Sequence, residues 1–281
     1  MISKSQAKFI KSLQLKKYRK QEQCFVVDGE KSVDEVLRSD FSIELLVVTE
    51  SYHKRKFEEL NRVKAAVVKA SDVQLAQLSS FQTNESVIAI VRQKPNQVPV
   101  LDTHEYALVV DDIRDPGNLG SIIRSADWFG IKKIIASEQT ADFYNPKVIN
   151  ATMGSFTRVQ MGYGNLVELI GKLNVPTYGT FMDGADVHTT SFEESGLIVI
   201  GNEANGISAA VQELITHRIT IPGKPGAESL NAAVATGIVL DNWSRLKKWL
   251  TLTAGLISDA LGMFFTQILV NCIVSTIDDG C

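Results

Sequence analysis

The polar residues of this sequence that could act on a substrate lie on three glycine-containing turns, each of which follows an apolar, strand-like segment. The first turn carries Asn118 and leads towards Arg124, the second carries Glu203, and the third carries Ser229 and Asn231. Glycine lets a backbone approach a ligand closely, and the start of a helix offers unpaired N–H groups to an anion. Amide, hydroxyl and guanidinium groups can bind and orient such a ligand, and a carboxylate can hold them in place.

Each turn taken singly is also explained by structure alone, because Glu203, Ser229 and Asn231 are residue types that commonly cap helices. The first turn is neither the G-x-G-x-x-G fingerprint of dinucleotide-binding proteins nor a P-loop, which disfavours nicotinamide and ATP as ligands. The four histidines and three cysteines show no metal-ligand spacing, so we expect no metal site.

The elements that must position the three turns alternate between strands and helices from residue 106 onwards. Strands are expected at 106–113, 132–137, 157–161, 176–181, 197–201 and 217–222. Helices are expected at 121–130, 146–152 and 165–173, from about Ser208 and from about Ser229. This alternation predicts a parallel α/β sheet that binds its ligands at the carboxyl ends of the strands.

Residues 1–98 predict a second, smaller α/β unit, joined by a linker at 99–105. Its strands are expected at 24–27, 43–48, 65–70 and 86–91, and its helices up to about Leu15 and at 29–40, 54–60 and 71–78. It holds 17 Lys and Arg against 12 Asp and Glu, a net charge of +5, whereas the rest of the chain has a net charge of −8. A basic domain on an acidic body favours RNA contact by that domain alone, although a solvated helix face would also explain the charge.

The three turns read in order as D-x-x-D-P-x-N-x-G-x-x-x-R-x-A-x-x-F-G, G-N-E-x-x-G-I and I-P-x-x-x-x-x-x-S-L-N. They resemble the three signature motifs of SpoU/TrmH-type RNA 2′-O-ribose methyltransferases of the SPOUT superfamily. Residues 1–98 also resemble the ribosomal-protein-like (L30e-like) substrate-binding domain of many members. The resemblance implies a trefoil-knot SPOUT methyltransferase domain at 106–249 and a homodimer in which each active site is completed by the partner subunit.

The resemblance also implies a division of roles among the residues of the turns. The positions that match the family's catalytic and substrate-orienting residues are Asn118, Arg124, Glu203, Ser229 and Asn231. Those that match its S-adenosylmethionine-binding residues are Gly201, Ile221 and Leu230, with Thr180 as a looser candidate.

The implied reaction moves a sulfonium methyl group to a ribose 2′-hydroxyl, and alignment of the reacting atoms can supply about 7–11 kcal/mol. Family accounts make the arginine at the position of Arg124 the base, but a guanidinium, with a pKa above about 12, is a poor proton acceptor. We therefore expect Arg124 to clamp an RNA phosphate and stabilise developing negative charge. Asn118 and Ser229 would orient the hydroxyl, and Glu203 would hold Arg124 or Asn231.

RNA is the expected partner, with ribosomal RNA favoured over transfer RNA because of the resemblance of the first domain. Phosphate contacts are expected from Lys16, Lys17, Arg19 and Lys20, and Tyr18 could stack on a base or pack internally. A non-catalytic RNA-binding or ribosome-assembly protein is the main alternative function. The odd cysteine count and the absence of an apolar secretion segment favour a cytoplasmic protein.

Residues 250–281 extend beyond the usual end of this class. Their apolar residues repeat with helical spacing, and polar or small residues lie on the other side, which predicts an amphipathic helix for packing or a dimer interface. A membrane span is the alternative, because about 26 residues here carry only one charge, Asp259, after three basic residues. The polar face disfavours it, and an altered C-terminus would also explain the segment.

Overall fold

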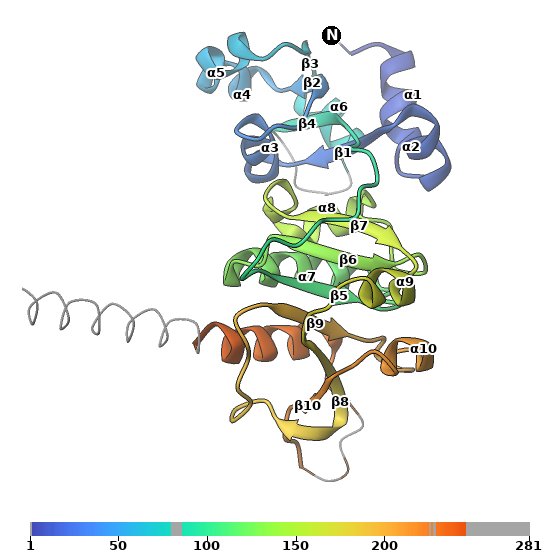
Figure 1. The fold of residues 1–281 in the computed structure, drawn as a ribbon. Helices are drawn as coiled ribbons and strands as arrows, with labels where there is room; N and C mark the ends of the chain where they lie inside the picture. The colour runs from blue at the N-terminus through green and yellow to red at the C-terminus, as the bar shows by residue number, and fades with distance from the viewer. Residues whose placement is uncertain (1, 80–85, 225, 227–228, 246–281) are drawn as a thin grey trace, which may run out of the picture. The chain divides into compact units, whose positions relative to one another are not determined.

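The computed structural model describes residues 2–79, 86–224, 226 and 229–245 of the chain, and its contacts divide the chain into units of residues 1–240 and 241–281. The first unit contains two separate β-sheets (Figure 1). Of the second unit only residues 241–245 are described, and they are helical. The predicted amphipathic helix at 250–281 lies outside the described residues. No helix in the described part of the chain is long and apolar enough to cross a membrane.

The N-terminal part is built on a four-stranded sheet with the strand order β1-β4-β2-β3. β4 pairs antiparallel with β1 and β2, and β2 pairs parallel with β3. The strands are β1 (Cys24–Asp28), β2 (Ile43–Val48), β3 (Ala66–Lys69) and β4 (Val87–Arg92). The helices are α1 (Lys4–Ser12), α2 (Lys16–Glu22), α3 (Glu30–Leu37), α4 (Glu50–Arg55), α5 (Phe57–Arg62) and α6 (Asp72–Leu78).

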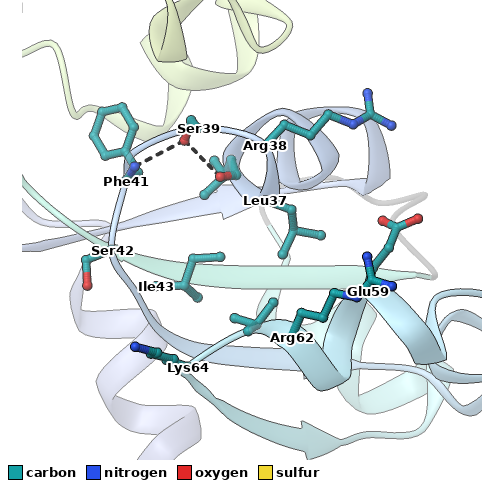
Figure 2. Close-up of a pocket in the computed structure, with 11 residues that line it drawn as sticks. Leu37, Arg38, Ser39, Phe41, Ser42, Ile43, Glu59, Arg62 and Lys64 are labelled. Carbon is teal, nitrogen blue, oxygen red and sulfur yellow. Dashed lines mark hydrogen bonds between the residues drawn. The ribbon is translucent and has the colours of Figure 1, made fainter.

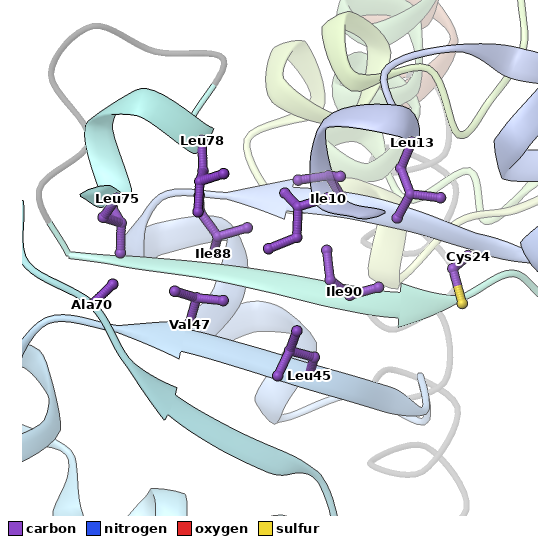
Figure 3. Close-up of a cluster of buried hydrophobic side chains, with 11 residues drawn as sticks. Ile10, Leu13, Cys24, Leu45, Val47, Ala70, Leu75, Leu78, Ile88 and Ile90 are labelled. Carbon is purple, nitrogen blue, oxygen red and sulfur yellow. The ribbon is translucent and has the colours of Figure 1, made fainter. Parts of the chain in front are cut away.

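The four strands of this part confirm the expected pattern, but its helices differ from it. α1 begins at a capping box between Ser3 and Gln6 and ends at Ser12, and the unpredicted α2 follows. The single helix expected at 54–60 is two helices that meet at Lys56. α1 and α6 contribute side chains to one apolar cluster on the sheet (Figure 3), whose buried members are Ile10, Leu13, Cys24, Val26, Leu45, Val47, Ala70, Leu75, Leu78, Ile88 and Ile90.

The second sheet has six strands, and every pairing in it is parallel, as expected. Its order is β10-β8-β9-β5-β6-β7. The strands are β5 (Tyr106–Val110), β6 (Lys133–Ser137), β7 (Gln160–Gly164), β8 (Thr177–Asp186), β9 (Gly196–Ile200) and β10 (His217–Thr220). The helices of this part are α7 (Pro116–Phe129), α8 (Pro146–Thr152), η1 (Ser155–Thr157), α9 (Leu166–Gly171) and α10 (Ala209–Gln212), and a further helical stretch begins at Ala232.

Two helix starts differ from the expectation. α7 begins at Pro116 rather than at residue 121, because Asp115 caps its N-terminus and proline suits the first helical position. The first glycine-containing turn is therefore the first turn of this helix. The last helix begins at Ala232 rather than at Ser229, because the side chain of Asn231 accepts hydrogen bonds from the backbone N–H groups of residues 233 and 234.

Aromatic and ionic contacts join the N-terminal part to the loop before α8 and to η1. The Phe25 ring on β1 lies 4.6 Å from the Tyr144 ring and 5.9 Å from the Phe156 ring, measured between centroids. Arg19 of α2 is only 2% exposed, and its guanidinium donates to Asp142 at 2.7 Å. The expectation that Arg19 contacts an RNA phosphate is therefore wrong in this structure, because its charge is buried and already paired.

Candidate active site

The first two turns lie side by side because β5 and β9 are neighbours in the sheet. The backbone N–H of Asp111 donates to the Ile200 carbonyl at 2.9 Å, which continues the pairing beyond the strands. The buried Asp111 carboxylate accepts from the Ser208 N–H at 2.8 Å, and the Asn202 amide donates to the Asp112 carbonyl at 2.8 Å. These bonds hold the two turns together at the carboxyl edge of the sheet.

The second turn folds back on itself in a conformation that glycine makes possible. Asn202 and Gly206 exchange two backbone hydrogen bonds, of 3.0 and 2.8 Å, and Gly206 has a φ of +66°. A Cβ atom on Gly201 would lie 2.3 Å from the carbonyl carbon of Gly206, far inside contact distance. The two backbone segments therefore touch, and a side chain at position 201 would push them apart.

A chain of hydrogen bonds connects the three turns through their polar side chains. The Asn118 amide donates to a Glu203 carboxylate oxygen at 2.5 Å, and the Asn231 amide donates to the Asn118 side-chain oxygen at 2.8 Å. Asn118 also donates its backbone N–H to Asp115, the cap of α7. Three residues from separate segments thus meet, and Asn118 is held from both ends of its side chain.

The side chains of Ser229 and Arg124 are not part of this series of side-chain hydrogen bonds. The Ser229 hydroxyl donates to the backbone carbonyl of Glu203 at 3.4 Å, which places the third turn against the second. Arg124 is exposed, and its guanidinium makes no hydrogen bond or ion pair with any residue that the structure describes. Glu203 was expected to hold Arg124 or Asn231. Its carboxylate contacts Asn118, which in turn contacts Asn231, so Glu203 is connected to Asn231 through Asn118 and not to Arg124.

Gly201 directly follows β9 and Ile221 directly follows β10, and Leu230 lies further along the third turn. Thr180 was expected at a strand end, but it lies inside β8, which continues to Asp186. Thr180 already donates its hydroxyl to the Val199 carbonyl at 3.1 Å. The backbone groups of Ile221 and Leu230 make no hydrogen bond with another described residue, and the Ile221 side chain is half-buried. Backbone groups of this kind, without a partner among the described residues, are what a nucleoside ligand could bind.

Sequence reasoning assigned no role to three residues that support this site. They are Asp111 and Asn202, which tie the first two turns together, and Asp115, which caps α7. The signal for Asp115 was a carboxylate directly before Pro-Gly, a typical helix start. Asp111 gave a weaker signal, an acid at the end of an apolar strand, and its partner lies 97 residues away.

An ion pair also lies within the first turn of the site. The Asp112 carboxylate accepts from the Arg114 guanidinium at 2.7 Å, and this hydrogen bond raises the pKa of Arg114. Arg114 is therefore committed within its own turn, whereas Arg124 is not. Among the described residues no group of three or more His, Cys, Asp or Glu side chains could hold a metal ion.

Two protein-family models match this chain, and together they cover most of it. The model of the SpoU rRNA Methylase family matches residues 105–241, and that of the MRM3-like substrate binding domain matches residues 4–89. The chain is 30% identical over 235 residues to the 23S rRNA (guanosine(2553)-2′-O)-methyltransferase RlmP of Bacillus subtilis (strain 168). The aligned region covers 82% of this chain and 92% of RlmP. The chain belongs to the SpoU rRNA methylase family.

Solved structures similar to this SpoU-family chain cover most of its length. A TrmH-family structure from Porphyromonas gingivalis has a TM-score of 0.77 at 35% identity and covers 87% of this chain and 99% of that chain. The AdoMet complex of the SpoU methyltransferase AviRb from Streptomyces viridochromogenes has a TM-score of 0.78 at 25% identity, over 87% of this chain and 98% of AviRb. The expected fold class, a substrate-binding domain followed by a SpoU methyltransferase domain, is confirmed.

Proposed function

We propose that this chain transfers a methyl group from S-adenosylmethionine to a ribose 2′-hydroxyl of ribosomal RNA. The observation that carries the proposal is the hydrogen-bonded chain Glu203–Asn118–Asn231, which brings together three sequence motifs from separate segments of a SpoU-family fold. Homologues with this activity include RlmP, and AviRb has been solved with AdoMet bound.

The chain's own residues fit a nucleoside cofactor. Gly201, Ile221 and Leu230 would hold it through backbone groups that make no hydrogen bond with another described residue outside helices and strands. Bound S-adenosylmethionine supplies an activated methyl group. The protein's task is then to bring the ribose oxygen into line and to stabilise the charge that develops on it.

Asn118 is the residue best placed to orient the hydroxyl. Glu203 and Asn231 fix its amide plane, which leaves one amide hydrogen and one lone pair of its oxygen for the substrate. Ser229, which lies against the same turn, would add a second polar contact. A fixed amide of this kind loses little freedom when the substrate binds, which favours an aligned complex.

Arg124 would hold an RNA phosphate close to the reacting ribose. It is exposed, permanently charged, and without an acidic partner in the described part of the chain. An arginine already paired with a carboxylate would bind an anion less well. Its role as a phosphate clamp is thus favoured over that of a base.

Residues 1–98 would select the RNA, residues 99–105 would link them to a catalytic domain at 106–249, and the enzyme would act in the cytoplasm as a homodimer. The family's trefoil knot would thread the second and third turns through each other, and the Ser229–Glu203 contact supports their proximity. Trp128, which is 83% exposed, and Val234 are apolar residues that a partner subunit would cover. Light scattering at micromolar protein concentration tests the dimer.

Calorimetric titration with S-adenosylmethionine tests the catalytic proposal. The wild type should bind with micromolar affinity, and Gly201→Ala should weaken binding at least tenfold because its Cβ would collide with Gly206. Gly171→Ala is the control, since a Cβ there meets nothing within 4 Å and the residue lies in α9, outside the three turns. Tritiated methyl should then appear as a 2′-O-methylnucleoside in unmodified 23S rRNA transcripts. No cofactor binding at millimolar concentration would refute the proposal.

A further inference from the structure

A cavity of about 470 Å³ lies in the N-terminal part, outside the site described above. It is formed by the end of α3 with the following loop and by the end of α5 with the following loop (Figure 2). Its volume falls within the ~300–1,000 Å³ typical of sites for small ligands. The residues that line this α3–α5 pocket are Val36, Leu37, Arg38, Ser39, Phe41, Ser42, Ile43, Glu59, Arg62, Val63 and Lys64.

The floor and the rim of the α3–α5 pocket differ in chemistry. Apolar side chains form part of the lining, here called the floor, and Figure 2 shows two of them, Leu37 and Ile43, between the two loops. The rim carries three exposed cations, Arg38, Arg62 and Lys64, none of which makes an ion pair with a residue that the structure describes.

The one acid among the lining residues offsets only part of this positive charge. Glu59 also lines the cavity, but its carboxylate is held at 3.2 Å by Lys56, which pairs with Asp34 as well. The Ser42 hydroxyl makes no side-chain hydrogen bond to a described residue and is available to a ligand. The pocket therefore offers apolar side chains, a hydroxyl without a side-chain partner among the described residues, and three cations against one carboxylate.

We propose that the α3–α5 pocket binds one unpaired nucleotide of the RNA substrate, with the base against the apolar floor and the flanking phosphates on Arg38, Arg62 and Lys64. The inference rests on the proposed function for the identity of the ligand as RNA. A base in a duplex is stacked and paired, so only a splayed nucleotide can enter a cavity of this size. Single-stranded sites combine apolar contact with the base and cationic contact with the backbone in this way.

The competing explanation for the three cations is structural. α3 and α5 both end at the pocket, and positive side chains stabilise the carboxyl ends of helices. A purely stabilising role predicts that removing the charges lowers the melting temperature and leaves RNA affinity unchanged. Nucleotide binding predicts that removing the charges lowers RNA affinity and changes the melting temperature little. The two explanations can therefore be separated by measuring both quantities.

The test compares two triple variants of the full chain. Arg38→Gln/Arg62→Gln/Lys64→Gln removes the rim, and Lys54→Gln/Arg55→Gln/Lys69→Gln removes the same charge from the same domain at residues that do not line the pocket. The control residues pair with Glu50 or Glu30 on the exposed surface. Filter binding to a mixed-sequence, single-stranded RNA of twelve nucleotides is measured between 50 and 200 mM salt, alongside melting temperature and cofactor titration.

The rim variant should lose at least about tenfold in RNA affinity at the lowest salt, and the control no more than about threefold. The slope of log K against log salt should fall by about 2, because each phosphate contact on single-stranded RNA contributes about 0.7. A duplex of the same length should compete at least tenfold more weakly than the single strand. Equal losses in the two variants, equal competition by the duplex, or micromolar binding of adenosine monophosphate that RNA does not displace would each overturn the assignment. Failure of the wild type to bind S-adenosylmethionine would instead count against the proposed function alone.

Discussion

The bond between Glu203 and Asn118 makes a quantitative prediction about catalysis. Glu203→Ala should leave Asn118 held only by Asn231, so that its amide plane can turn away from the reacting ribose. A hydrogen bond to a charged group contributes about 1.5–3 kcal/mol. If that whole contribution is expressed in the transition state, the rate of methyl transfer should fall about 10- to 150-fold.

The assay is single-turnover transfer of tritiated methyl to 23S rRNA at saturating cofactor, with Glu203→Ala, Asn118→Ala and the double variant. Because Glu203 acts through Asn118, the double variant should be no slower than the Asn118 variant, which corresponds to a coupling energy of about 1.5–3 kcal/mol. Glu203→Gln should retain part of the rate, because its amide oxygen still accepts from Asn118. Glu213→Ala, which removes an exposed carboxylate elsewhere, should have the wild-type rate. Rate losses that add within about 0.5 kcal/mol would refute the reasoning.

Three further predictions concern stability. Gly120→Ala should cost about 1–3 kcal/mol, because the new Cβ would lie 2.5 Å from a side-chain atom of α8, whereas Gly171→Ala, in open space, should be neutral in thermal unfolding. Burial raises the pKa of Tyr144 to about 12, so the folded state keeps a proton that the unfolded state releases above about pH 10. The free energy of unfolding, measured by urea titration, should therefore fall as the pH rises from 10 to 12. It should fall less steeply with pH in Tyr144→Phe, and an equal pH dependence in the two proteins would contradict this assignment. Arg19→Met should cost about 3 kcal/mol, because it leaves Asp142 unpaired at a largely buried contact, and adding Asp142→Asn should recover part of that loss.

The sequence permitted a reliable prediction of the parallel sheet and of the edge that carries the site. Continuous apolar runs such as 106–110 and 196–200 become strands buried on both faces, and parallel strands expose their following turns at one edge. The polar positions of the three turns were therefore visible as candidates before their geometry was known. Local rules were sufficient here because each strand and turn is specified by adjacent residues.

Pairing between distant side chains could not be predicted in the same way. The partner of Glu203 lies 85 residues away in the sequence, and nothing in the local pattern distinguishes Asn118 from Arg124 as its target. Arg19 posed the same problem, because it occurs within a basic run that suggests a solvated surface. Its burial depends on Asp142, 123 residues away, and on carbonyl groups of the turn before α2. Such contacts depend on the packing of whole elements, which residue types alone do not specify.

The partner that Glu203 takes has a consequence for substrate binding. A carboxylate paired with Arg124 would cancel the positive charge of that guanidinium and leave the site electrostatically neutral towards RNA. By holding the neutral amide of Asn118 instead, Glu203 fixes the residue that orients the hydroxyl and leaves the Arg124 charge uncompensated among the described residues. The same separation occurs within the first turn, where Asp112 pairs with Arg114 and not with Arg124. Glu203 and Asp112 therefore hold neighbouring residues in position and do not pair with Arg124. The charge of Arg124 remains to attract the RNA phosphate backbone, which must approach an otherwise acidic domain.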